Sequence, residues 1–310
     1  MGQNEIRFDQ LCWRHAYKLC CPKNANFSTS ETKEWIIIRN ALLGISLCLV
    51  ALSARADDDF EAVKLQLIAD NPAAQLSDVT YTDNRLNLGN TQVSDINALS
   101  GLTTLKMLYL SLNQVSDISV LSGLTALEHL DLGNNPVSDV SSLSGLTALK
   151  SLDLFNTQVS DISALSGLTT LKHLELRDTQ VSDISALSGL TVLKHLELRD
   201  TQVSDISALS ALTALQYLDL SHTQVSDISA LSELTALEFL YLMSTSVSDV
   251  SSLSRLTELY ELDLSDAQVS DISALSGLSW LGFLHLNNTP AMSDVSQIQH
   301  LIDNGLKIGE

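Results

Sequence analysis

The sequence predicts an α/β solenoid, in which short coils stack and their strands join into one parallel sheet. The first observation is a duplication: LKHLELRDTQVSDISALS occupies residues 171–188 and again, unchanged, residues 193–210. The second is that the period of twenty-two residues between these copies continues far beyond them. The third is an L-x-x-L-x-L stretch in each period, which alternates apolar and variable positions as a strand with one buried face does.

Rows of twenty-two residues show the period most clearly. Each row reads L-T-x-L-x-x-L-x-L-x-x-[NT]-x-V-S-D-[IV]-x-x-L-S-x with small lapses, and a weaker row covers residues 80–101. The rows start at Leu102, Leu124, Leu146, Leu168, Leu190, Leu212, Leu234, Leu256 and Leu278. One row cannot bury its own leucines, whereas stacked rows align them into a continuous core with strands about 4.8 Å apart. Every coil then meets nearly the same neighbours, which explains the copying.

The segment V-S-D-I-S-A-L-S after each strand predicts a short 3₁₀ or helical turn capped by Asp or Ser. Its aspartates stack from row to row at Asp117, Asp139, Asp161, Asp183, Asp205, Asp227, Asp249 and Asp271. Stacked like charges repel, so each carboxylate must gain something locally, and capping backbone N–H groups is sufficient. Calcium bridging is the alternative, although the glycine-rich loops of calcium-binding β-helix repeats are missing from the sequence.

These rows resemble the leucine-rich repeat, in the short twenty-two-residue class found in bacterial internalins and in a eukaryotic phosphatase-regulatory subunit. The resemblance covers about residues 80–299. It implies a leucine-rich-repeat horseshoe with a parallel β-sheet on the concave face and short 3₁₀ or helical turns on the convex face.

The rows depart from the family pattern after the strand, where Asn commonly bonds to neighbouring backbone. Asn113 and Asn135 keep it, whereas threonine replaces it at Thr157, Thr179, Thr201, Thr223, Thr245 and Thr289, and Ala267 has no polar group. Threonine has fewer hydrogen-bonding groups, so we expect a weaker ladder between coils.

The chain divides by composition into five segments. Residues 1–32 are polar and unpatterned, and we expect them to be disordered or mis-assigned; residues 33–56 read as a signal peptide with an apolar run and an Ala-Arg-Ala exit near Ala56. The alternative is an uncleaved anchor formed by residues 36–54. Residues 57–79 are predicted to be an N-terminal helical cap, residues 80–299 the repeats, and residues 300–310 a C-terminal cap.

Composition excludes several classes of partner and site. The formal net charge of −20 disfavours nucleic acid and anionic membrane surfaces. The four cysteines, Cys12, Cys20, Cys21 and Cys48, all precede the repeats and match no zinc-module spacing. We therefore expect no cofactor and no metal.

The concave face carries the candidate binding site, because row positions six, eight and ten point away from the core and vary most between rows. A polar patch combines His129, Asp131, Asp153, His173, Glu175, His195 and Glu197. Four of its side chains, from the two copied rows, could form a metal square, but Arg177 and Arg199 can neutralise the glutamates. An acidic docking surface with pH-responsive histidines is the favoured interpretation.

The second patch is apolar and comprises Tyr217, Phe239, Tyr241, Met243 and Phe283. Aromatic side chains that cluster on a concave sheet are typical anchors of an interface. The alternative is that these rings only pack on each other and on neighbouring strands.

These features predict a non-enzymatic, exported and monomeric binding module. Serines occur in every row, and a combination such as His173, Glu175 and Ser151 lacks an evident pocket or oxyanion donors, so no catalytic residue is predicted. A protein ligand is expected, with a glycan as the alternative, in the secreted, periplasmic or envelope compartment. The rival functions are a cytoplasmic regulatory scaffold like the phosphatase subunit and a purely structural envelope protein.

Overall fold

A computed structural model of the chain describes residues 56–76, 79 and 81–309. The predicted segment 1–32 and the signal peptide up to residue 55 lie outside the described residues. The chain falls into two units, residues 1–65 and 66–310. In the first unit, residues 56–65 form the N-terminal part of helix α3 (Ala56–Asp70). The second unit contains the repeats.

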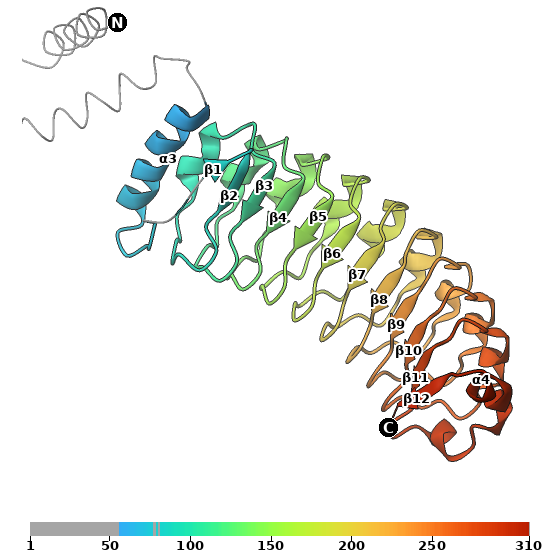
Figure 1. Cartoon of the computed structure of the whole chain (residues 1–310). Coiled ribbons are helices and arrows are strands. Elements are labelled where there is room, and N and C mark those ends of the chain that lie inside the picture. The colour runs from blue at the N-terminus through green and yellow to red at the C-terminus, as the bar shows by residue number, and fades with distance from the viewer. Residues whose placement is uncertain (1–55, 77–78, 80, 310) are drawn as a thin grey trace, which may run out of the picture. The chain divides into compact units, whose positions relative to one another are not determined.

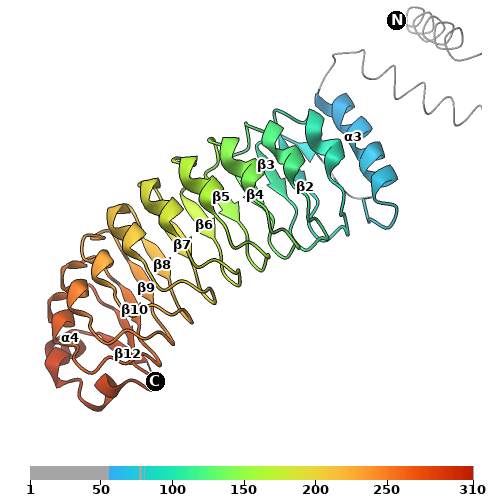
Figure 2. The ribbon, with the colours of Figure 1, turned by 180° about the vertical axis from the view of Figure 1, so that it is seen from behind.

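The second unit is a solenoid whose described strands form a single twelve-stranded sheet in sequence order. Strands line its concave face and 3₁₀ turns its convex face, as the two opposite views show (Figures 1 and 2). The strands are β1 (Tyr81–Thr82), β2 (Arg85–Asn87), β3 (Met107–Tyr109), β4 (His129–Asp131), β5 (Ser151–Asp153), β6 (His173–Glu175), β7 (His195–Glu197), β8 (Tyr217–Asp219), β9 (Phe239–Tyr241), β10 (Glu261–Asp263), β11 (Phe283–His285) and β12 (Lys307–Gly309). Only β1 is antiparallel to its neighbour, β2; the pairs from β2 to β12 are parallel.

The copied apolar residues build the core. The central leucine of each parallel strand from β2 to β11 is buried, for example Leu174 and Leu196 at 0% exposure, while its two neighbours face outward. The pairing joins residues twenty-two apart, such as Leu174 with Leu196, so each leucine stacks on its own copy. The predicted α/β solenoid is confirmed.

A copied aspartate lies two residues before the start of every convex turn except Pro290–Ser293. The carboxylate of Asp183, for example, accepts a hydrogen bond from the backbone N–H of Ser185 at 2.8 Å, at the start of the turn Ser185–Gly189. This bond, with a second from the Ser185 side chain, lowers the pKa of Asp183. The turns are η1 (Asn97–Gly101), η2 (Ser119–Gly123), η3 (Ser141–Gly145), η4 (Ser163–Gly167), η5 (Ser185–Gly189), η6 (Ser207–Ala211), η7 (Ser229–Leu231), η8 (Ser251–Arg255), η9 (Ser273–Gly277), η10 (Pro290–Ser293) and η11 (Ser296–Ile298). The predicted capping role of the aspartates is confirmed.

Asparagine and threonine behave differently after the strand. The Asn135 amide donates to the carbonyl oxygens of Leu110 and Leu132, and its oxygen accepts the N–H of Val115 at 3.0 Å, so it ties two coils together. The Thr179 hydroxyl donates only to Leu176 O, within its own coil, at 2.6 Å. The threonine coils therefore lack the side-chain bond to the preceding coil that the asparagine coils have.

The N-terminal edge of the second unit is tied to the first coil by Asn71, which directly follows α3. Its side-chain oxygen accepts the N–H groups of Ser94 and Asp95, at 2.8 and 2.9 Å. Its amide donates to Leu67 O and Asp95 O. These bonds repeat what Asn113 and Asn135 do between later coils, and they suit the predicted cap, whose boundaries remain a prediction.

The C-terminal end has a short helix and, beyond it, a strand that was not predicted for residues 300–310. Helix α4 (Gln299–Asp303) is followed by β12, which extends the sheet beside β11. A Cβ on Gly309 would overlap the His285 ring, so glycine lets β12 approach that strand. The helical pattern gave no indication of this strand.

Candidate binding surface on the concave face

The predicted site residues occupy one face of the sheet. His129, His173, His195, Tyr217, Phe239 and Phe283 share one in-register column of strands β4 to β11. Asp131, Glu175, Glu197 and Tyr241 share the second column, two residues along each strand, and Met243 lies just beyond β9. His173 is exposed and the others are half-buried.

The polar patch is organised around Glu197. The Glu197 carboxylate lies 2.8 Å from His195 Nε2 and 3.6 Å from Arg177 Nη1. The Arg177 guanidinium also lies over the Phe155 ring, 4.5 Å from its centre. Arg199 does not neutralise a glutamate as expected, because its Nε pairs with Asp200 at 3.1 Å. Arg177 is therefore the arginine whose charge acts on both copied glutamates, Glu175 and Glu197.

Two carboxyl groups of this patch are electrostatically linked. Burial and a hydrogen bond to Glu197 raise the pKa of Glu175 to about 8. The hydrogen bond from His195 lowers the pKa of Glu197 to about 2 despite its burial. At neutral pH Glu175 is therefore the protonated member of the pair. The patch then carries less negative charge than it would with both carboxyl groups ionised.

The polar and apolar patches are one continuous surface. The His195 ring stacks on the Tyr217 ring, with centres 4.0 Å apart and planes 12° apart. Tyr217 then contacts Tyr241 and Phe239, with centres 5.5 and 6.3 Å away. The histidine that ends the polar patch is thus the first ring of the aromatic series.

Tyr260 was missed by the sequence analysis, although it joins the aromatic series. It lies edge-on to Phe239 and to Phe283, with centres 6.2 and 5.6 Å apart, and is 44% exposed. Its ring lies over Gly282, where a Cβ would be 2.7 Å from Tyr260 Cε2. The signal was present in the sequence: row position five also varies from coil to coil, and it carries glycine only in the row after Tyr260.

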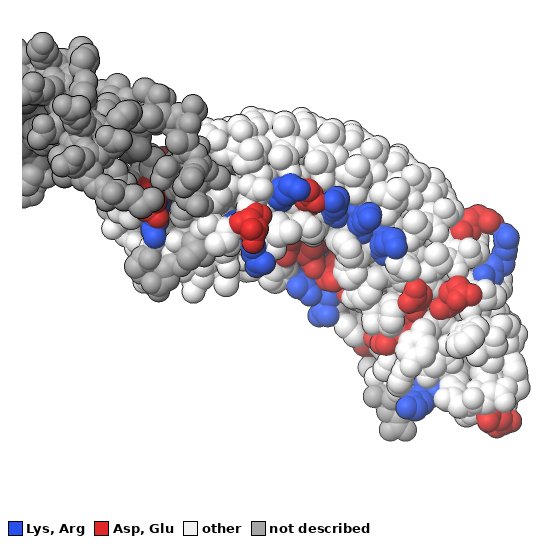
Figure 3. Space-filling model, turned by 45° about the horizontal axis from the view of Figure 1, so that its top comes forward, with Lys and Arg blue, Asp and Glu red and all other residues white. Residues whose placement is uncertain are grey.

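Row position five, which is occupied by Tyr260 in its coil, carries lysines in several earlier coils. Glu128 pairs with Lys106 and Lys150, at 3.1 and 2.5 Å. Lys172 and Lys194 are exposed and have no ion-pair partner within the described part of the chain. Figure 3 shows a line of basic side chains over the central coils, with acidic side chains beside it and further ones toward the C-terminal coils.

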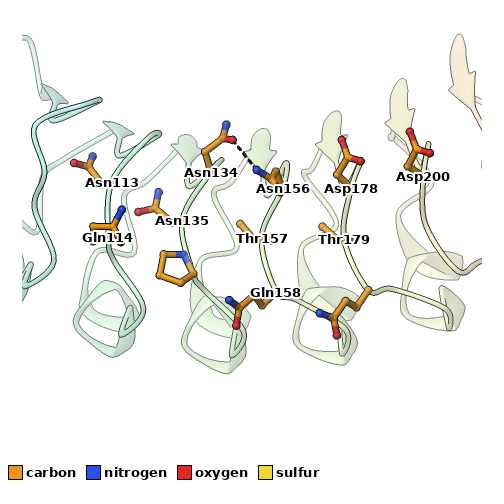
Figure 4. Close-up of a pocket in the computed structure, with 12 residues that line it drawn as sticks. Asn113, Gln114, Asn134, Asn135, Asn156, Thr157, Gln158, Asp178, Thr179 and Asp200 are labelled. Carbon is orange, nitrogen blue, oxygen red and sulfur yellow. Dashed lines mark hydrogen bonds between the residues drawn. The ribbon is translucent and has the colours of Figure 1, made fainter.

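A polar groove of about 520 Å³ follows the loops after strands β3 to β7. Asn134, Asn156, Asp178 and Asp200 project along it from successive coils, and Asn156 donates to Asn134 at 2.8 Å (Figure 4). All four have φ between 50° and 57°, a left-handed backbone that Asn and Asp adopt more readily than most residues. Backbone geometry therefore accounts for their recurrence.

Metal binding and membrane crossing find no support among the residues that the structure describes. No group of three or more His, Cys, Asp or Glu side chains there is arranged to hold a metal ion. No described helix is both long and apolar enough to span a bilayer. The catalytic combination of His173 with Ser151 also finds no support, because the described residues show no hydrogen bond between these two side chains.

Comparisons with known proteins agree with this architecture. A family model described as leucine-rich repeats (2 copies) matches residues 103–145, 125–167, 147–189, 169–211, 191–233 and 213–259. An internalin (inlF) from Listeria monocytogenes is 32% identical, with a TM-score of 0.71, over 82% of this chain and 75% of that one. Internalin C2 (inlC2) from the same organism is also 32% identical, with a TM-score of 0.52, over 73% of this chain and 92% of that one. No curated protein matches the chain by sequence.

A plant protein shares the fold alone. The ectodomain of the Arabidopsis thaliana receptor kinase GASSHO1/SCHENGEN3, solved in complex with Casparian strip integrity factor 2, is 21% identical with a TM-score of 0.61, over 73% of this chain and 35% of that one. None of these matches indicates a catalytic family. The chain belongs to the leucine-rich-repeat family, its coils are of the internalin-like class, and its solenoid is a protein-interaction module.

Proposed function

We propose that the chain is an exported, non-enzymatic binding module that holds a protein partner on its concave face. One observation carries this proposal. The side chains that vary from coil to coil meet on one face and form a continuous histidine-to-aromatic surface, whereas the copied apolar side chains are buried and the copied aspartates cap turns. Repetition of the fold explains the second group and leaves the first free to suit a partner.

The aromatic half is the proposed hot spot. Tyr217, Phe239, Tyr241 and Phe283 are half-buried and already held against each other or against Tyr260, so a partner would lose little side-chain entropy in ordering them. Met243 and the polar residues His129, Asp131, His173, Glu175, His195 and Glu197 would surround that contact as a rim.

Export rests on the sequence of residues 33–56 and on the likeness to internalins. Cleavage near Ala56 would release the repeats outside the cytoplasm, either secreted or within the periplasm or envelope. Retention by residues 36–54 would instead leave them anchored at a membrane.

Substitution of the hot spot tests the binding function. We expect Phe239→Ala and Tyr241→Ala each to weaken capture of the partner by at least tenfold, because truncating a central aromatic anchor costs upward of about 2 kcal/mol. Photo-crosslinking from position 217 in extracellular and envelope fractions of the host, followed by mass spectrometry, identifies the partner, and its titration gives the affinity.

The matched control is Leu112→Ala, which removes a side chain that is 57% exposed outside the aromatic series. Melting temperatures should agree within a few degrees for all three variants. Unchanged binding by both aromatic variants would refute the hot spot. If a crosslinker placed on the convex face captures the same proteins as position 217, a purely structural role is supported.

A further inference from the structure

We propose that Tyr241 is the anchor for an arginine side chain of the protein partner, which deepens, and rests on, the proposed function above. The ring lies in the second outward-facing column of the sheet, in strand β9, and is half-buried. Its in-register neighbours in that column are Asp219 in β8 and Asp263 in β10. An aromatic face between two carboxylates suits a planar cation.

Aromatic rings on this face already take cations from the chain itself. The guanidinium of Arg85 lies 4.6 Å from the centre of the Tyr109 ring, which occupies the same column as Tyr241. Arg177 lies over Phe155 at 4.5 Å, and Lys307 lies over Phe283 at 5.0 Å. Among the described residues, no Lys or Arg lies over Tyr217, Phe239 or Tyr241.

The C-terminal coils that carry these rings contain few cations of their own. From residue 212 onward, Arg255 and Lys307 are the only Lys or Arg residues in the sequence. Arg255 ends the convex turn η8 and pairs with Glu233. Lys307 lies over the Phe283 ring. Because no cation among the described residues reaches Tyr241, we assign this position to an arginine of the partner.

Of the two carboxylates beside Tyr241, Asp263 is half-buried and open to such a cation, whereas Asp219 is only 7% exposed and acts through its charge. Asp219 and Asp263 each use one oxygen to accept a backbone N–H two residues along, from Ser221 and Ser265, both at 2.8 Å. Burial and the nearby Glu261, Asp219 and Asp263 together raise the pKa of the Tyr241 hydroxyl to about 12. Burial is the largest of these causes, and the three acidic side chains are the part of the environment that favours a positive charge beside the ring.

Arginine fits better than lysine on chemical grounds. A guanidinium stacks flat on an aromatic ring while its N–H groups reach carboxylates at the ring edge, whereas an ammonium is a compact, strongly hydrated charge. His195 covers one face of Tyr217 at 4.0 Å, so Tyr241 is the more accessible of the two tyrosines. Phe239 lies in the neighbouring column and offers the aliphatic part of the side chain an apolar contact.

The test uses three synthetic peptides: acetyl-Gly-Arg-Gly-Arg-Gly-Arg-amide and its citrulline and lysine counterparts. Citrulline keeps the shape of arginine but not its charge. Isothermal titration of the full chain should show binding of the arginine peptide at least tenfold tighter than the citrulline peptide, and tighter than the lysine peptide. Equal affinity for arginine and citrulline would overturn the proposal.

Variants locate the site. Tyr241→Leu should weaken the arginine peptide about tenfold, whereas Tyr109→Leu, whose ring already carries Arg85, should change its affinity less than twofold. Asp263→Asn should weaken it severalfold, whereas Asp271→Asn makes the same charge change on a convex turn and should have little effect. An equal effect of Asp263→Asn and Asp271→Asn would mean that only net charge matters.

Circular dichroism and melting temperature establish that each variant folds. If the aromatic variants lose the natural partner while the wild-type chain does not prefer the arginine peptide, the binding function stands and the arginine anchor is wrong. If the arginine preference and its loss in Tyr241→Leu are observed but no crosslinked partner depends on Phe239 or Tyr241, the anchor stands and the proposed function fails.

Discussion

His173 and His195 have identical sequence surroundings, yet the structure gives them different roles. His195 is followed by the Tyr217 coil, so its ring stacks there and bonds to Glu197. His173 is preceded by the Ser151 coil and is exposed, with its ring centre 5.9 Å from that of His195. Partial desolvation of its ring and the neighbouring His195 lower the pKa of His173, although the residue as a whole is exposed. Copying a row therefore copies its core but not the environment of its outward side chains.

The proton held by Glu175 predicts a pH dependence of stability. The folded pKa of about 8 lies above the ordinary value of 4.5, so the folded state holds a proton that the unfolded state has lost between these pH values. The free energy of unfolding should therefore fall as pH rises through this window. Glu175→Gln mimics the protonated group, and its melting temperature relative to wild type should rise between pH 5 and pH 9.

The control for this measurement is Glu258→Gln, which changes an exposed carboxyl in the turn before β10. Its melting temperature relative to wild type should stay constant over the same pH range. If the melting temperatures of Glu175→Gln and wild type change in parallel with pH, no proton is held at this site.

Single coils differ in how they are tied to their neighbours. Val115 N–H is accepted by Asn135 of the following coil, whereas no side chain of the following coil accepts the N–H of Val159, because Thr179 bonds only to Leu176. The sequence predicted a weaker ladder in the threonine coils, and the hydrogen bonds confirm it. The stack is held there by leucine packing and backbone pairing.

Thr179→Asn should restore the missing tie and stabilise the chain. An asparagine there would accept the N–H of Val159 and donate to the carbonyl oxygens of Leu154 and Leu176, as Asn135 does with the equivalent groups two coils earlier. We expect a gain of about 1 kcal/mol in the free energy of unfolding, measured by urea titration. Thr179→Val, which has no polar group, should be destabilising, and a loss of stability with Asn would contradict the ladder argument.

The outward chemistry of the solenoid changes along its length. Lys172 and Lys194, which have no ion-pair partner among the described residues, lie beside the central coils with the polar patch, whereas the aromatic rings occupy strands β8 to β11. In-register stacking fixes these groups about one strand spacing apart, so the surface presents a fixed order of chemistry to a partner. A partner should therefore bind in one direction.

Export makes a prediction about the mature chain. N-terminal sequencing of the protein from its own cells should start at Asp57 if the segment 33–56 is removed. An intact N-terminus in the cytosol would contradict export and favour the regulatory-scaffold alternative. An intact N-terminus in the membrane fraction would favour an anchor at residues 36–54.

The period of twenty-two residues was enough to predict the coils, the buried leucines, the capping aspartates and the outward columns, because these depend only on what every coil repeats. It could not predict the His195–Tyr217 stack, the seat of Tyr260 on Gly282 or strand β12 beside His285. Each of these depends on the side chain that the adjacent coil places one strand spacing away. A long side chain settles against whichever neighbour it meets, and only the folded stack brings those neighbours together.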